Sequence, residues 1–123
     1  ASYSQWIAND FLASADFDIH MRNLVKQLAK RRDQLAVSLR SYLKDQADFA
    51  IPQGGIHLWC RLTREFNEIQ LLEESIKKGV IYAPGTTLGT ERGYVRFTFA
   101  REKEETIHEG IKRFADALAV VST

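Results

Sequence analysis

The sequence is poor in several residue types that mark specialised protein classes. Of its 123 residues, one is cysteine, two are proline and three are histidine. A lone cysteine, Cys60, excludes a disulfide within the chain and favours a reducing compartment, so we expect a cytoplasmic protein. One cysteine and three scattered histidines also fall short of a zinc-finger ligand set, and we expect no metal site.

Neither charge nor hydropathy departs far from that of a soluble globular protein. Lysine and arginine total 17 against 16 aspartate and glutamate, a net charge of +1 that lacks the basic excess of a dedicated nucleic-acid domain. No apolar run reaches the length of about 20 residues that a membrane span needs, and no signal peptide is visible. Hydrophobic residues make up 45% of the chain, which is enough for the core of one domain.

Helical and strand patterns alternate along the chain and predict eight elements. Their order is helix, helix, strand, strand, helix, strand, strand, helix, with approximate ranges 2–13, 16–44, 49–51, 56–62, 67–79, 80–82, 94–99 and 102–118. This mixture is typical of an α+β fold. We expect a two-layer sandwich, with a small four-stranded, mostly antiparallel or mixed sheet and helices on one face.

Apolar spacing within the helices predicts which sides face the core. The predicted inward residues of the second, third and last helices are Met21, Leu24, Leu28, Leu35, Leu39 and Tyr42, then Ile69, Leu72 and Ile76, then Ile107, Ile111, Phe114 and Leu118. Asp16 or Asp18 is expected to cap the second helix. Asn67 caps the third, and Gly79 ends it as a C-terminal glycine.

Strict alternation assigns two faces to the longer strands. One face is apolar and contains Ile56, Leu58, Cys60, Leu62, Val95, Phe97 and Phe99, whereas the other contains His57, Trp59, Arg61, Tyr94, Arg96 and Thr98. The second face is too aromatic for an ordinary solvated surface and too charged for a core. We therefore expect it to bind a ligand or to be covered by something outside this sequence.

Arg96 is the residue of greatest chemical interest on that face. It lies in mid-strand beside Tyr94, where an unpaired charge is costly. A planar guanidinium there is suited to bidentate capture of a carboxylate or a phosphate. A structural ion pair with an acidic residue is an equally good explanation from periodicity alone.

Four other motifs have ordinary explanations that we favour. The Gly85–Gly93 loop lacks the spacing of a P-loop or dinucleotide fold, which indicates a plain connection. Seven cations against one Asp in residues 20–44 suit a solvated face better than a nucleic-acid footprint. His57 has no nucleophile at a suggestive spacing, and Cys60 points to the apolar face, where a thiol is inert.

Five stretches in this order resemble the C-terminal small domain of fold-type I pyridoxal-phosphate aminotransferases. The likeness is greatest to the MocR subfamily of GntR-type transcriptional regulators and to related aminoadipate-type aminotransferases. The stretches, which span about residues 15 to 120, are His20–Arg22, Lys30–Leu35, Pro52–Trp59, Ala83–Gly85 and Val95–Ala100.

The resemblance implies a role for individual positions. Arg96 stands where the family binds the α-carboxylate of its amino-acid substrate, and two pairs of residues border the active-site mouth: Gly54 with Gly55, and Pro84 with Gly85. No catalytic residue of the family falls within this chain. Pyridoxal phosphate is implied as the cofactor of the parent chain, with none bound by this fragment alone.

The resemblance also implies how the chain is organised. We expect residues 1–123, which begin with Ala1 rather than methionine, to be one domain cut from a longer chain. Residues 2–13 would form the helix that connects it to the large cofactor-binding domain. The implied partners are that large domain, an amino-acid ligand, a second copy in a homodimer, and DNA through an absent N-terminal domain; no membrane is implied.

Two other functions stay open from the residues alone. The first is a stand-alone α+β module that binds RNA through the aromatic and basic sheet face, although the near-neutral charge argues against it. The second is a dimerisation domain built on the first two helices.

Overall fold

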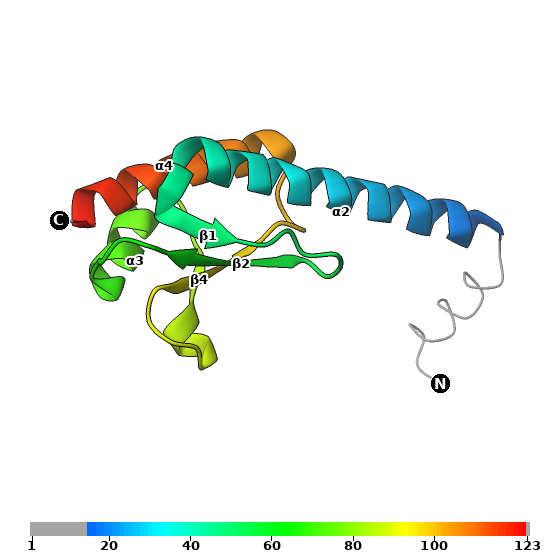
Figure 1. Ribbon diagram of the computed structural model, residues 1–123. Coiled ribbons are helices and arrows are strands. Elements are labelled where there is room, and N and C mark those ends of the chain that lie inside the picture. The colour runs from blue at the N-terminus through cyan, green and yellow to red at the C-terminus, as the bar shows by residue number, and fades with distance from the viewer. Residues whose placement is uncertain (1–14, 123) are drawn as a thin grey trace.

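The computed structural model describes residues 15–122, so the helix predicted over 2–13 lies outside the described residues. Figure 1 shows a long helix and a C-terminal helix lying along one side of a small sheet. The helices and strands are α2 (Ala15–Tyr42), β1 (Ala47–Phe49), β2 (His57–Leu62), α3 (Glu68–Lys77), β3 (Ala83–Pro84), β4 (Tyr94–Thr98) and α4 (Glu104–Val121). Short 3-10 turns cover Lys44–Gln46 and Gly85–Leu88.

The sheet has four strands in the order β1-β2-β4-β3, and every neighbouring pair is antiparallel. The β1–β2 hairpin pairs Ala47 with Leu62 and Phe49 with Cys60. This arrangement confirms the predicted α+β class with a small antiparallel sheet and helices packed on one face. Among the described residues, no helix is both long enough and apolar enough to cross a bilayer.

The core lies between the sheet and the helices, and strand alternation predicted its strand residues correctly. Six of the seven predicted apolar-face residues are buried: Leu58, Cys60, Leu62, Val95, Phe97 and Phe99. The prediction is wrong for Ile56, which lies just before β2 and is 38% exposed. On α4, the predicted stripe Ile107, Ile111, Phe114 and Leu118 is buried as well. Phe114 packs edge-on against the rings of Tyr82 and Phe97, with ring centroids 5.1 Å away in each case.

Two predicted strands lie elsewhere along the chain. The first strand is Ala47–Phe49 rather than 49–51, and the third is Ala83–Pro84 rather than 80–82. The shift of the third strand has a local cause. Gly79, at φ +82°, turns the chain at the end of α3, and the Val80 amide donates to the Ser75 carbonyl at 2.8 Å. That amide completes the helix C-cap, so Val80 does not pair in the sheet.

The inward face predicted for α3 is wrong. Leu71 and Ser75 are fully buried, whereas Ile69 and Ile76 are 71% and 53% exposed and Leu72 is only partly buried. Helical spacing finds an apolar stripe but does not say which side meets a neighbour, and here α3 packs through a neighbouring side of the same helix. Its Asn67 cap is confirmed, because the Asn67 side chain accepts from the Gln70 amide.

The N-terminal half of α2 extends past the sheet in Figure 1. Met21 and Leu24, predicted to be inward, are therefore exposed, while Leu35 and Leu39 are buried against the core. Asp16 and Asp18 do not precede the helix but lie in its first turn, where the helix dipole favours negative charge.

Candidate functional site

The sheet face turned away from the helices carries the polar and aromatic side chains predicted for it. Three cross-strand pairs between β2 and β4 build this open face, which we define by His57 and Thr98, Trp59 and Arg96, and Arg61 and Tyr94. Trp59, Arg61 and Thr98 are exposed, and the other three are half-buried. The register brings all six predicted residues together on two adjacent strands.

Arg96 lies at the centre of the open face, on a strand that is held by a neighbour on each side. Its strand is paired on both sides, because Arg96 is opposite Trp59 on β2 and opposite Ala83 on β3. Its Nε is buried and has no hydrogen-bond partner. Within the described part of the chain, no carboxylate forms an ion pair with it. The structural ion pair that periodicity left open is thus not found among residues 15–122.

Other polar groups of the open face are partly engaged. Asp48 and Arg61 form an exposed cross-strand ion pair, with 2.7 Å between Oδ2 and Nη2. His57 Nδ1 lies 2.8 Å from Thr98 Oγ1. The charge of Arg61 is therefore already balanced within the chain, in contrast to that of Arg96.

The two predicted border segments flank Arg96 from opposite ends of the sheet. Gly54 and Gly55 lie in the exposed turn that precedes β2, with Gly55 at φ +77°. Pro84 pairs with Val95 on β4, and Gly85 follows it. A Cβ at Gly85 would lie 2.7 Å from the Cβ of Tyr94 and 2.8 Å from its carbonyl oxygen, so only glycine fits this position without a shift.

Glu68 holds the glycine-rich loop in place, a role that the sequence pattern did not indicate. As the first residue of α3, it accepts from the Gly93 amide at 3.2 Å and from the Thr86 hydroxyl at 2.8 Å. The loop is therefore tied to a helix N-terminus through an acidic side chain. This supports the prediction that the loop is a connection, because one carboxylate ties both its ends.

Cys60 is fully buried on the apolar face of β2. Burial, with a smaller contribution from the charge of Asp48, raises the pKa of its thiol to about 12. Since the thiolate is the reactive form, this cysteine is inert at neutral pH, as predicted.

The basic character of α2 is partly used in packing. The Arg31 guanidinium donates to the Ala100 carbonyl. Arg32 contacts Asp33 at 3.1 Å and the Pro52 carbonyl at 3.4 Å. Both arginines thus join α2 to loops at the end of the sheet.

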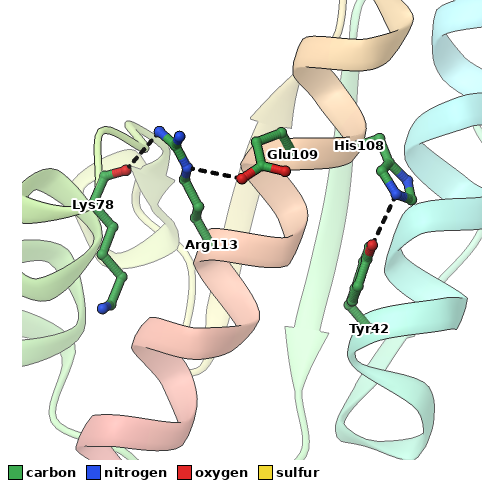
Figure 2. Close-up of polar contacts among 5 residues, drawn as sticks. All are labelled: Tyr42, Lys78, His108, Glu109 and Arg113. Carbon is green, nitrogen blue, oxygen red and sulfur yellow. Dashed lines mark hydrogen bonds and ion pairs between the residues drawn. The ribbon is translucent and has the colours of Figure 1, made fainter.

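A second group of polar contacts lies in the helix layer, and the sequence analysis missed it (Figure 2). Tyr42 on α2 and His108 on α4 share a hydrogen bond of 2.8 Å between the hydroxyl and Nε2. Arg113 contacts Glu109 at 3.2 Å and donates to the Lys78 carbonyl at the end of α3. These contacts join α4 to α2 and to α3, which is a structural role.

The open face fits part of the chemistry of a pyridoxal-phosphate site. None of its six residues is a lysine, so these residues offer no amine for covalent attachment of the cofactor. What they offer is a central, unpaired guanidinium that suits a carboxylate.

Comparisons with known proteins identify the family of the chain. Residues 1–114 match the family model described as aminotransferase class I and II. The chain therefore belongs to the class I and II aminotransferase family. This confirms the resemblance drawn from the five sequence stretches.

The relatives include both enzymes and regulators. The aromatic-amino-acid aminotransferase 1 of Thermococcus litoralis is 30% identical over 120 residues, which are 95% of this chain and 29% of that protein. YdfD of Bacillus subtilis, an uncharacterized HTH-type transcriptional regulator, is 28% identical over 112 residues, 90% of this chain and 23% of that protein. The chain thus spans less than a third of the length of these relatives.

A solved structure shows the same fold. The kynurenine aminotransferase of Pyrococcus horikoshii, in complex with PMP, matches with a TM-score of 0.77 and 28% identity. The match covers 86% of this chain and 27% of that one. The family and its solved members with phosphopyridoxyl ligands imply pyridoxal phosphate as the family's cofactor.

Proposed function

We propose that this chain is the substrate-side small domain of a pyridoxal-phosphate-dependent aminotransferase-like protein, in which Arg96 binds the α-carboxylate of an amino acid. One observation carries the proposal. The Arg96 Nε is buried and unpaired at the centre of a sheet face that the helices leave open. A buried donor without a partner is costly, and a carboxylate from outside the described residues would satisfy it.

In this proposal, the domain orients the amino-acid substrate. When bound, pyridoxal phosphate supplies the electron sink for reaction at the amino acid's Cα. The planar guanidinium of Arg96 fixes the carboxylate by two parallel hydrogen bonds, which sets both the position and the rotation of the substrate. A strand paired on both sides holds that guanidinium more rigidly than a loop would.

We further propose that the parent is a transcriptional regulator of the GntR/MocR type, in which the aminotransferase-like body senses its ligand. HTH-type regulators among the relatives support this reading. In such a parent, the large domain holds the cofactor, a separate N-terminal domain binds DNA, and two copies form a dimer. The Gly54–Gly55 and Pro84–Gly85 segments border the mouth of the site.

The test uses the full-length parent saturated with pyridoxal phosphate. Arg96→Lys keeps the charge but loses the planar fork, and we expect amino-acid binding to weaken by about 2–5 kcal/mol, roughly 30- to 5,000-fold. Isothermal titration calorimetry with the twenty proteinogenic L-amino acids measures the dissociation constants.

Arg61→Lys is the matched control, since Arg61 lies on the same face but is exposed and paired with Asp48. We expect this control to bind amino acids as the wild type does. Equal affinity in the Arg96→Lys protein and the wild type would refute the assignment.

A further inference from the structure

A second side chain of the open face keeps unused hydrogen-bonding capacity beside Arg96. His57 pairs with Thr98 across the β2–β4 ladder, and Arg96 lies two residues from Thr98 on the same strand. His57 and Arg96 are therefore diagonal neighbours on one face, a relation that places their Cα atoms roughly 7–8 Å apart. Both lie beside Trp59, which is directly opposite Arg96.

The Thr98 hydroxyl restrains the imidazole of His57. Nδ1 lies 2.8 Å from Thr98 Oγ1, which fixes the orientation of the ring. Among the described residues, nothing hydrogen-bonds the other ring nitrogen, Nε2. When the Thr98 hydroxyl donates to Nδ1, the neutral ring carries its proton on Nε2 and offers one donor.

The two ends of the open face differ in whether their polar groups already have a partner within the chain. Arg61 is already paired with Asp48 at 2.7 Å, so its charge is satisfied within the chain. At the His57 end no described group hydrogen-bonds Nε2, which is a donor in the tautomer in which Thr98 donates to Nδ1. In that tautomer, the His57 end of the open face has an unused donor beside a ligand held at Arg96.

We propose that His57 is a specificity-determining residue, whose Nε2 donates to an acceptor on the side chain of the amino acid held by Arg96. The ligand class is then an amino acid with a carboxylate or amide side chain. Such a molecule carries two acceptor groups a few ångströms apart, as two neighbouring donors on one face require. Thr98 is a positioning residue that acts through His57. The inference rests on the function proposed above and assigns its ligand class.

The test compares two His57 variants in the full-length parent saturated with pyridoxal phosphate. Asparagine places a polar atom near Nδ1 and nothing near Nε2, whereas glutamine reaches the position of Nε2. The probes are L-glutamate and L-glutamine, and the control ligand is L-norvaline, whose side chain has no hydrogen-bond acceptor. Calorimetry gives each dissociation constant, and thermal melting reports the folded state.

We expect the wild type to bind L-glutamate or L-glutamine more tightly than L-norvaline. His57→Asn should weaken the tighter of the two polar probes about 10-fold and L-norvaline less than 2-fold, whereas His57→Gln should stay within about 3-fold of the wild type for all three. Thr98→Val should lose part of the same preference, and Thr98→Ser should restore it.

A wild-type preference for L-norvaline would overturn the inference. So would equal losses for all probes in His57→Asn, or no loss at all. If Arg96→Lys retains wild-type affinity, the proposed function itself fails. If only the Arg96 variant weakens binding, the carboxylate site stands and the role of His57 is wrong.

Discussion

At the residue scale, the sheet separates two polar side chains on neighbouring strands. Cys60 and Arg96 lie on opposite faces of the sheet, Cys60 toward the helices and Arg96 on the open face. The thiol is sealed in an apolar core that keeps it protonated. The guanidinium keeps a buried Nε donor that has no hydrogen-bond partner among the described residues, and such a donor requires an acceptor.

The raised pKa of Cys60 makes the stability of the domain depend on pH in the alkaline range. In the unfolded chain the thiol loses its proton near pH 9.0, whereas the folded protein keeps it until about pH 12. Its contribution to stability is therefore complete below pH 9 and is lost as pH rises toward 12, with a slope of at most about 1.4 kcal/mol per pH unit.

Replacing Cys60 by alanine should remove that slope. We expect urea unfolding between pH 8.5 and 10.5 to show a steeper fall in the wild type than in Cys60→Ala. A thiol reagent should modify the folded wild type slowly and the urea-unfolded protein rapidly. Parallel pH profiles for the two proteins, or fast modification of the folded state, would show that the thiol is accessible.

At the element scale, the loop between β3 and β4 depends on α3. Glu68 accepts two hydrogen bonds from that loop, from Thr86 and from Gly93. Removing both acceptors in Glu68→Ala should lower the free energy of unfolding by about 1–2 kcal/mol and speed amide exchange at Gly93. Chemical denaturation and hydrogen exchange measure the two effects.

Glu73→Ala is the matched control, because Glu73 is an exposed acidic residue on the same helix with no hydrogen bond to the loop. Both substitutions replace a glutamate of the same helix by alanine, so their difference in stability reports the two hydrogen bonds of Glu68 together with its charge at the helix N-terminus. Amide exchange at Gly93 reports the tether alone. If both variants lose equal stability and Gly93 exchange is unchanged, Glu68 does not hold the loop.

Local patterns in the sequence predicted some elements and not others, for physical reasons. Alternation in β2 and β4 predicted the core and open faces correctly, because a two-residue period leaves only two sides. The side of α3 that packs was missed, since Ile69 and Ile76 form a stripe that no described neighbour covers fully. Tethers such as Glu68 to Gly93 join distant residues and have no local signal.

In the candidate site, too, local patterns predicted some features and not others. Strand alternation placed Arg96 with Trp59 on one face, and the register confirms that they are direct neighbours. The bond between His57 and Thr98 depends on that register, which a single sequence does not fix. The proposed site also needs groups that these residues do not supply, and no pattern in these residues predicts them.

At the scale of the whole molecule, one face of the sheet is covered by helices and the other is not. Helices cover the apolar face of the sheet, while the open face presents an unpaired arginine and exposed Trp59. The class I and II aminotransferase relatives are more than three times as long as this chain. A domain that supplies half of a shared site explains both facts, and an RNA-binding module explains only the first.

The most direct measurement is a crystal structure of the full-length parent with pyridoxal phosphate and its tightest-binding amino acid. We predict that two nitrogens of the Arg96 guanidinium, either both Nη atoms or Nε with one Nη, each lie about 2.7–2.9 Å from an oxygen of the amino acid's α-carboxylate. An Arg96 side chain paired instead with an acidic residue of the parent, with the α-carboxylate bound elsewhere, would contradict the account.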